Sequence, residues 1–489
     1  MLFSSNTFLF LFLPAALAGY YLLGLTRRVW IKNAALLAAS LLFYAWGEPR
    51  FVFALPACAL LDWLLALGIR RSQRRGRRGA LPLAAGLSLH LLLLFGYKYL
   101  GFALETLGRI LPGGWPAGIP QPALPLGLSF FTFQTLSYLT DVYRGKAEAL
   151  RRFGDAALYL IFFPQLVAGP IVRCGGFAPQ IRRRQESWAL AEEGVVRLTT
   201  GLAKKTLLAD SLAVAANCAF GTDLLAGEPL STSLAWLGLL AFSLQIYFDF
   251  SGYSDMAVGL GLLFGFRLPE NFRYPYAARS VADFWRRWHR TLGAWFRDYI
   301  YIPLGGSRKG LPRTLANLLL VWLLTGLWHG ANWTFLAWGL WYFLFLAAER
   351  LLGRLRKTPS GETPSPFLRS LPGRLWTLGA VGLGWVFFRA DSLHHAAAYL
   401  GRLFGLGAGS LTDGLSRFLL QDLRFLLPIA LTAALPILPR LGRTAWRGTP
   451  LSQTAAWRTL RPAAVVLLLL LAVSAALRGE YHPFVYFRF

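Results

Sequence analysis

The sequence is short of charge, of acidic residues and of cysteine. Only 15% of its 489 residues are charged, whereas a soluble globular chain has about 25%. Its three cysteines, Cys58, Cys174 and Cys218, lie far apart and at no metal-ligand spacing. We therefore expect neither a disulfide framework nor a metal centre. The polar connections between apolar runs are too short to fold alone, so we also expect no separate soluble domain.

Apolar runs take the place of the missing charge. The chain is 55% hydrophobic and its mean hydropathy is +0.47. A membrane helix needs about 20 apolar residues, and clear runs lie at 8–25, 29–47, 51–69, 80–100, 232–248, 315–328, 333–348, 375–388, 424–438 and 463–477. Weaker runs lie at 124–143, 157–172 and 253–266. We predict an all-α fold: one polytopic membrane domain over 1–489, with about 10–13 membrane helices plus re-entrant or interfacial helices.

The net charge of +27 is placed mainly in loops between the apolar runs, as in RRSQRRGRR at 70–78. This placement follows the positive-inside rule and indicates anionic lipid as the neighbour. We expect no nucleic-acid partner, because no soluble domain presents the charge. Arg27, Arg28 and the 70–78 cluster lie in alternate loops, which predicts an N-terminus on the outer side.

A stripe of polar residues marks the run SFFTFQTLSYLTDVYRG at 129–145. Gln134, Ser137, Tyr138 and Asp141 are spaced to share one face of a helix. Such a stripe faces a bundle interior or a watery cavity. It can also serve only to hydrogen-bond one helix to another, and both interpretations stay open.

Two carboxylates lie in FSLQIYFDFSGYSDMAVGLG at 242–261. Gln245 shares a helix face with Asp249, and Ser251 shares one with Asp255. The pair Ser251-Gly252 predicts a helix break, which membrane proteins tolerate only where protein or water satisfies the freed backbone. The two aspartates suit proton relay, ion coordination or orientation of an imidazole, or structural pairing with an arginine of the same chain.

The segment ADFWRRWHRTLGAWFRDYIYIPLGGSRKG at 282–310 predicts one amphipathic helix at the membrane interface. Its aromatic face carries Trp285, Trp288, His289, Leu292, Phe296 and Tyr299. Its basic face carries Arg286, Arg290 and Arg297, which suit either the phosphates of a nucleotide-like ligand or lipid headgroups.

His329 stands in the apolar run LLTGLWHGANWTFLAWGLW at 323–341. A histidine leaves water only if it stays neutral and its ring nitrogens find partners. A neutral imidazole in a dry pocket is also a competent general base. The residues alone leave catalysis or transport open beside a satisfied structural histidine. We expect His90 in an apolar helix and His394 and His395 in a loop.

Seven motifs occur together and in order: FPQLVAGPIVR (163–173), IYFDFSGYSDMAVGLG (246–261), PENFRYPY (269–276), DFWRRWHRTLGAWFRDYIYIPLGGSR (283–308), LTGLWHGANWTFLAWG (324–339), WVFFRADSL (385–393) and VYFRF (485–489). Together with YAWGEPRF at 44–51 they span nearly the whole chain. They resemble the membrane-bound O-acyltransferases, in the bacterial branch that contains the membrane subunit of alginate O-acetyltransferase. One departure is Tyr342-Phe343, where relatives are expected to carry His-Gly.

The resemblance implies a central catalytic funnel, with the family motifs concentrated at about 125–345. It implies His329 as the catalytic histidine and His289 as the second of the pair. It also implies acetyl-CoA as the acyl donor, with no metal. Trp285, Arg286, Arg287 and Arg297 are then candidate donor contacts. Candidates that line or tune the tunnel are Gln134, Asp141, Asp249, Asp255, Trp328 and Asn332.

The resemblance further implies transfer of acetyl from cytoplasmic acetyl-CoA to a hydroxyl on the outer side of a bacterial inner membrane. The final acceptor expected is a cell-surface polysaccharide, alginate-like first of all. A periplasmic acetyl-accepting protein of the transferase or esterase kind is the expected partner, although a direct route to sugar stays open.

Two other functions compete with this one. A proton-coupled transporter or exporter would use Asp141, Asp249, Asp255 and His329 as a proton path. Inverted repeats with paired broken helices would support it, and the sequence has none. A scaffold would leave the grouped tryptophans, arginines and histidines of 283–332 unexplained. Only the enzyme consumes acetyl-CoA, and only the transporter responds to an imposed proton gradient.

Overall fold

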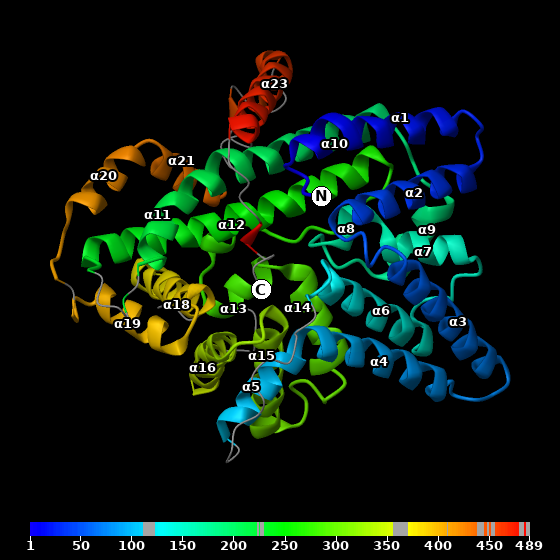
Figure 1. Cartoon of the computed structure of the whole chain (residues 1–489), viewed down its shortest axis with the longest axis horizontal. Coiled ribbons are helices and arrows are strands. Elements are labelled where there is room, and N and C mark those ends of the chain that lie inside the picture. Colours follow the sequence, from blue (N-terminus) through cyan, green and yellow to red (C-terminus); the bar gives the residue numbers. More distant parts are fainter. Residues whose placement is uncertain are drawn as a thin grey trace. The chain divides into compact units, whose positions relative to one another are not determined.

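The computed structural model describes residues 1–110, 123–222, 224, 229–355, 370–407, 409–437, 445–446, 449–450, 455–478 and 484–485. Within these ranges every regular element is helical except for one short antiparallel strand pair (Figure 1). The predicted all-α class is confirmed. Of the motif VYFRF, only Val485 is described, and positions 486–489 lie outside the described residues.

The chain divides into two compact units, and α12 (Thr232–Leu263) contributes to both. The first contains Met1–Gly201 and Tyr253–Glu270, and the second contains Leu202–Gly252 and Asn271–Phe489. The expectation of a single domain over 1–489 stays a prediction.

The first unit is built from the N-terminal helices. They are η1 (Phe8–Phe12), α1 (Leu13–Gly24), α2 (Val29–Gly47), α3 (Ala54–Arg74), α4 (Ala80–Leu94), η2 (Phe95–Tyr99), α5 (Leu100–Ile110), α6 (Leu128–Tyr143), α7 (Phe153–Ile161), α8 (Phe163–Leu166), α9 (Cys174–Arg182) and α10 (Trp188–Ala203). The helices α3, α4 and α6 lie side by side (Figure 1). A buried pair joins them, because His90 lies 2.7 Å from Asp62 and the Thr135 hydroxyl donates to the same carboxylate at 3.2 Å.

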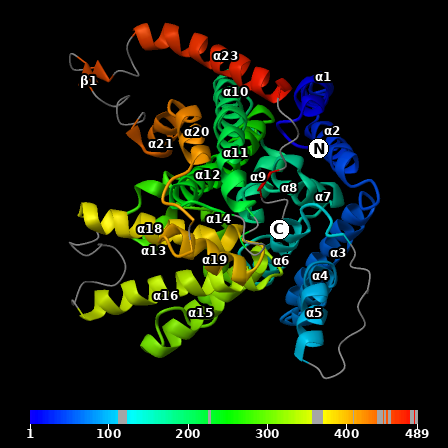
Figure 2. The ribbon, with the colours of Figure 1, turned by 60° about the vertical axis from the view of Figure 1, so that its left-hand side comes forward.

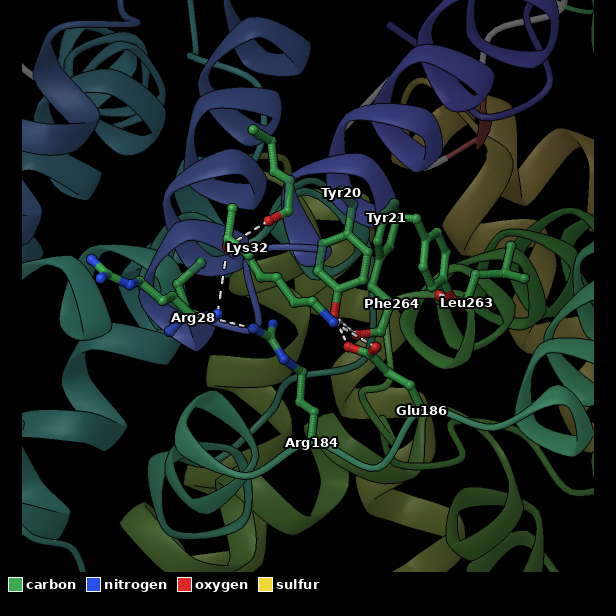
Figure 3. A network of polar contacts seen from close by, with 11 residues as sticks. Tyr20, Tyr21, Arg28, Lys32, Arg184, Glu186, Leu263 and Phe264 are labelled. Carbon is green, nitrogen blue, oxygen red and sulfur yellow. Dashed lines mark hydrogen bonds and ion pairs between the residues drawn. The ribbon is translucent and has the colours of Figure 1, made fainter.

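A polar cluster in the first unit ties α1, α2 and the α9–α10 connection to the end of α12 (Figure 3). The Glu186 carboxylate accepts hydrogen bonds from the Tyr20 hydroxyl at 2.5 Å and from Lys32 at 2.6 Å. The Tyr20 hydroxyl also lies 3.0 Å from the carbonyl oxygen of Phe264. Burial opposes ionisation of Glu186, but the hydrogen bonds from Lys32 and Tyr20 and the charges of Lys32 and Arg184 outweigh it and lower its pKa.

The second unit holds most of the family motifs. Its elements are η3 (Lys204–Ala209), α11 (Asp210–Phe220), η4 (Pro275–Ala277), α13 (Val281–Arg287), α14 (Arg290–Phe296), η5 (Arg297–Tyr301), α15 (Gly310–His329), α16 (Trp333–Leu355), α18 (Leu371–Arg389), α19 (Leu393–Leu403), α20 (Gly414–Asp422), α21 (Leu426–Ala434), β1 (Ala445–Trp446), β2 (Thr449–Pro450) and α23 (Ala455–Arg478). The helices α15 and α16 form a hairpin, and α18 packs on α16 (Figure 2).

Two glycines allow α15 and α16 to approach backbone to backbone. A Cβ at Gly326 would lie 2.3 Å from the carbonyl oxygen of Phe335, and one at Gly339 would lie 2.4 Å from that of Trp322. Small residues at a helix crossing are the usual way to bring membrane helices this close. The crossing places α16 directly against the end of α15 that carries His329.

Six helices in the described ranges are long and apolar enough to cross a membrane. They are Val29–Gly47, Ala80–Ile110, Thr232–Leu263, Gly310–His329, Trp333–Gly353 and Thr459–Arg478. The chain is a multi-pass membrane protein. Several other predicted runs form shorter helices: 157–172 divides into α7 and α8, and 424–438 contains the nine-residue α21. The count of about 10–13 membrane helices stays a prediction.

Two local predictions are wrong. The helix break predicted at Ser251-Gly252 does not occur, because α12 continues through both residues. A single glycine weakens a helix interior by only about 1 kcal/mol, and both residues are buried in packed surroundings. His394 and His395 are not in a loop but in the first turn of α19, where the Ser392 side chain accepts the His395 N–H and starts the helix.

Candidate active site

His329 lies in an aromatic shell at the last residue of α15. Only 4% of its surface is exposed. Its ring centroid lies 4.7 Å from that of Trp328, 4.9 Å from Trp338 on α16 and 5.2 Å from Phe388 on α18. Three helices thus enclose the imidazole that the sequence predicted to be buried. A shell of this kind excludes bulk water from any group that reaches the ring.

His289 interrupts the predicted interfacial helix. The helix α13 ends at Arg287, His289 adopts a left-handed backbone with φ of 41°, and α14 begins at Arg290. The prediction of one continuous helix over 282–310 is therefore wrong. The cause is Asn271, whose backbone carbonyl accepts the N–H of Arg290 at 2.9 Å in place of an intrahelical partner.

Asn271 also determines which nitrogen of His289 carries the proton. The Asn271 Oδ1 accepts the backbone N–H of Thr291 at 3.3 Å and its hydroxyl at 3.0 Å. Because a backbone N–H can only donate, the oxygen of this amide must face that side. The same oxygen lies 3.1 Å from His289 Nδ1, so Nδ1 is the protonated nitrogen and Nε2 carries the lone pair. Asn271 belongs to the motif PENFRYPY, but no local sequence pattern indicated this role.

Both predicted histidines contact the indole ring of Trp328. Trp328 lies 4.7 Å from the His329 ring and 5.8 Å from the His289 ring, measured between centroids. The His289 ring also contacts Phe250 of α12 edge-on at 4.7 Å. Residues 289 and 329, forty positions apart in the chain, are thus brought into one aromatic cluster by α12, α15 and the α13–α14 junction.

His289 is buried and neutral at physiological pH. Burial lowers its pKa from the ordinary 6.5 to about 3, since removal from water penalises the charged ring. A neutral imidazole with its proton held at Nδ1 presents a basic Nε2. It can therefore accept a hydrogen bond from a hydroxyl throughout the physiological pH range.

The buried state of His289 makes stability depend on pH. The unfolded chain binds a proton near pH 6.5 that the folded chain binds only near pH 3. This contribution to stability is complete above about pH 6.5 and is lost as the pH falls toward the folded pKa. We expect the thermal unfolding midpoint to decrease when the pH is lowered from about 7 to about 5. The decrease should be smaller in His289→Gln. Equal pH dependence in both proteins would contradict the assignment.

Asp249 lies next to this aromatic cluster in the chain and is paired with a lysine. Its carboxylate is 2.9 Å from Lys205 Nζ, which also contacts Asp210 at 2.7 Å. Its second oxygen accepts the backbone N–H of Val485 at 2.7 Å. Asp249 directly precedes Phe250, the residue that contacts His289. Lys205 was missed in the sequence, where a lysine in the apolar stretch GLAKKTLLAD was the available signal.

Comparison with known proteins decides the family. Residues 126–388 match the model of the MBOAT, membrane-bound O-acyltransferase family. The chain belongs to this family. The whole chain is also 40% identical to the probable alginate O-acetylase AlgI of Pseudomonas putida, over all of both proteins. It is 35% identical to the peptidoglycan O-acetyltransferase of Helicobacter pylori, over 84% of this chain and 81% of that protein. It is 27% identical to the teichoic acid D-alanyltransferase of Bacillus subtilis, over 61% and 80%.

The family match confirms the resemblance and identifies the chain as an O-acyltransferase of the membrane. The motif-bearing region at about 125–345 falls inside the matched residues. Tyr342, at the position where the resemblance predicted a histidine, has a packing role. Its hydroxyl donates to the carbonyl oxygen of Val381 at 3.1 Å, and a Cβ at Gly384 would lie 2.6 Å from that hydroxyl. Tyr342 therefore fastens α16 to α18 in this O-acyltransferase.

The candidate donor contacts of the O-acyltransferase are mostly engaged with nearby carboxylates. Arg286 and Arg287 lie 3.6 Å and 3.1 Å from Asp283, and Arg297 lies 2.7 Å from Asp298. Both Arg286 and Arg297 remain more than half exposed. Their role in donor binding stays a prediction.

Trp285 points into the protein rather than along the basic face. Its ring lies 4.8 Å from those of Trp322 and Tyr342 and 5.4 Å from that of Trp338. These contacts pack α13 against the α15–α16 hairpin. A direct donor contact by Trp285 stays a prediction.

The remaining predicted residues fall into two groups. Asn332 lies beside His329, where its side chain accepts the Thr334 N–H at 3.1 Å and donates to the carbonyl oxygen of Asp391 at 3.0 Å. The others, Gln134, Asp141 and Asp255, belong to the first unit. Gln134 donates to the Tyr159 carbonyl oxygen at 2.6 Å, and Asp255 is 2.7 Å from Arg197. For these two residues the contacts favour the structural alternative.

Proposed function

We propose that this O-acyltransferase moves an acetyl group from cytoplasmic acetyl-CoA to a hydroxyl acceptor on the outer side of a bacterial inner membrane. The end product is an O-acetylated cell-surface polysaccharide, alginate-like first of all. The observation that carries the proposal is the pair of buried imidazoles at Trp328. The full-length identity with an alginate O-acetylase supports the choice of acetyl and of polysaccharide.

His329 acts as the general base in this proposal. It takes the proton of the acceptor hydroxyl while the oxygen attacks the carbonyl carbon of the thioester. The C–O bond forms, the C–S bond breaks, and the departing sulfur takes the proton from His329 to become the coenzyme A thiol. Protons and electrons balance without an added co-reactant, and a thioester is already activated for this transfer.

His289 orients the acceptor. The hydrogen-bond pattern puts its proton on Nδ1, toward Asn271. The basic Nε2 therefore suits a hydroxyl donor better than a developing oxyanion, which needs an N–H. Stabilisation of the oxyanion by His289 would require the other tautomer and the loss of the Asn271 contact.

The membrane explains the remaining features of the proposal. Coenzyme A carries several phosphates and does not cross lipid, whereas the polysaccharide lies outside. Transfer of the small neutral acetyl group alone solves this mismatch. The donor's phosphates stay on the cytoplasmic side, where Arg286, Arg287 and Arg297 are the proposed contacts. A periplasmic protein with a reactive hydroxyl is the proposed first acceptor and passes the group to sugar.

Transfer of labelled acetyl in proteoliposomes tests the function. Acetyl-CoA is supplied on one side and the candidate periplasmic partner, or free polysaccharide, on the other. Label on the partner or the sugar, together with release of one thiol per acetyl group, is the expected result. Absence of thiol release, with solute movement that follows an imposed proton gradient, would overturn the proposal in favour of the transporter.

A further inference from the structure

Two charged residues near the end of the apolar helix α16 have no place in the chemistry described above. Glu349 and Arg350 follow the run WTFLAWGLWYFLFLAA. A charged pair in such a helix often serves only to reach the membrane surface. Here both side chains are engaged with protein instead, at the two segments that flank His289.

Glu349 accepts hydrogen bonds from the segment before His289. One carboxylate oxygen accepts the backbone N–H of Val281 at 2.7 Å, and the other accepts that of Ala282 at 3.0 Å. The next N–H, of Asp283, donates to the Ser280 hydroxyl at 3.1 Å. The first N–H groups of a helix have no partner within it. Glu349 of α16 therefore provides the hydrogen-bond acceptors that the first N–H groups of α13 lack, and this fixes where α13 begins.

Arg350 donates a hydrogen bond to the segment after His289. Its Nη1 donates to the Tyr301 hydroxyl at 3.1 Å. Tyr301 closes η5, which continues directly from α14. Adjacent residues of one helix thus hold the chain on both sides of the left-handed turn at His289.

The same helix also holds the other histidine. Trp338 of α16 contacts the His329 ring at 4.9 Å, and Trp338 lies eleven residues before Glu349. At about 1.5 Å per residue, the two points are about 16 Å apart along one helix. In Figure 2, α13 lies beside α16 and α18, in agreement with the packing of Trp285 on Tyr342.

We propose that Glu349 and Arg350 are positioning residues. They hold the segments on both sides of His289 against α16, and so keep His289 in a fixed position relative to His329. The inference rests on the proposed function, because this relative position matters only if the two imidazoles act on one substrate. Displacement of a catalytic group by about 1 Å can slow a reaction about 10²-fold. Glu349→Gln keeps the size of the side chain but replaces one acceptor oxygen by an amide that cannot accept an N–H.

The test measures kcat and KM for acetyl-CoA in Glu349→Gln, with turnover expressed per donor-binding protein molecule. We expect kcat to fall about 10- to 100-fold, with KM changed little. Tyr301→Phe removes only the hydroxyl at the second contact, and we expect a smaller loss of kcat. Asp413→Ala is the matched control, because Asp413 accepts an N–H at the start of another short helix, α20. It should lower the unfolding midpoint and leave kcat unchanged.

Three outcomes are distinct. Loss of kcat at wild-type donor binding supports the positioning role. A wild-type kcat per donor-binding molecule in Glu349→Gln, even with a lower unfolding midpoint, overturns it and leaves Glu349 a purely structural residue. Absence of acetyl transfer in the wild-type protein, with its partner present, counts against the proposed function instead.

Discussion

Replacement of His329 by alanine is expected to slow acetyl transfer about 10²- to 10⁴-fold, the usual contribution of a general base. The imidazole is buried among Trp328, Trp338 and Phe388. Water that enters the vacated space is a far weaker base than the ring it replaces. Transfer of labelled acetyl in proteoliposomes, at matched amounts of folded protein, measures the effect.

The binding of coenzyme A separates chemistry from folding in this variant. We expect it to be retained, since the donor's phosphates are bound outside the aromatic cluster in the proposed scheme. His394→Ala is the matched control, because His394 lies exposed in the first turn of α19, and its activity should equal that of wild type. Transfer within a few-fold of wild type in His329→Ala would reduce His329 to a structural histidine and move the base role to His289.

Replacement of Lys205 by methionine is expected to destabilise the protein by about 3–5 kcal/mol. The side chains of Lys205 and Asp249 are 7% and 1% exposed, and their charged atoms lie 2.9 Å apart. Methionine keeps the length of the chain but leaves the Asp249 charge buried without its cation. The unfolding midpoint in detergent, by heat or denaturant, measures the loss.

A second substitution tests the cause. Asp249→Asn added to Lys205→Met removes the stranded charge, and its amide oxygen can still accept the Val485 N–H. We expect the double variant to recover most of the lost stability. Lys204→Met is the control, because this neighbouring lysine lies over the Tyr247 ring at 5.9 Å instead of in the buried pair. Equal destabilisation in the single and double variants would show that packing of the lysine chain, not charge, matters.

Local patterns predicted the elements better than their ends. The aromatic spacing of 282–310 is helical on both sides of His289, so nothing in it indicated the turn. The turn arises because Asn271, eighteen residues earlier, captures the N–H groups of Arg290 and Thr291. At Ser251-Gly252 the composition indicated a break that the structure does not have, because buried packing keeps α12 helical there.

The candidate site was predicted in part for a similar reason. His329 and Asp249 were visible because a polar group in an apolar run is costly unless it is partnered or used. Asn271, Lys205 and Glu349 were not assigned roles, since the partners that link them to the site, His289, Asp249 and the start of α13, lie far away in the chain. Hydrogen bonds across such separations leave no periodic signal.

Composition and the pattern of apolar runs were enough to predict that the protein lies in a membrane and that its fold is all-α. Scarce charge and repeated apolar runs leave a helical membrane protein as the solution that satisfies every backbone group in lipid. The ordered motifs determined the family in the same way. Which polar residues contact one another depends on the tertiary structure: His289 and His329 both contact Trp328, whereas Asp255 is paired with Arg197. The composition determines, for each residue, the free energy of transfer from water into the membrane or the protein core. Chemistry depends on distances between side chains, and only packing of the whole chain sets those.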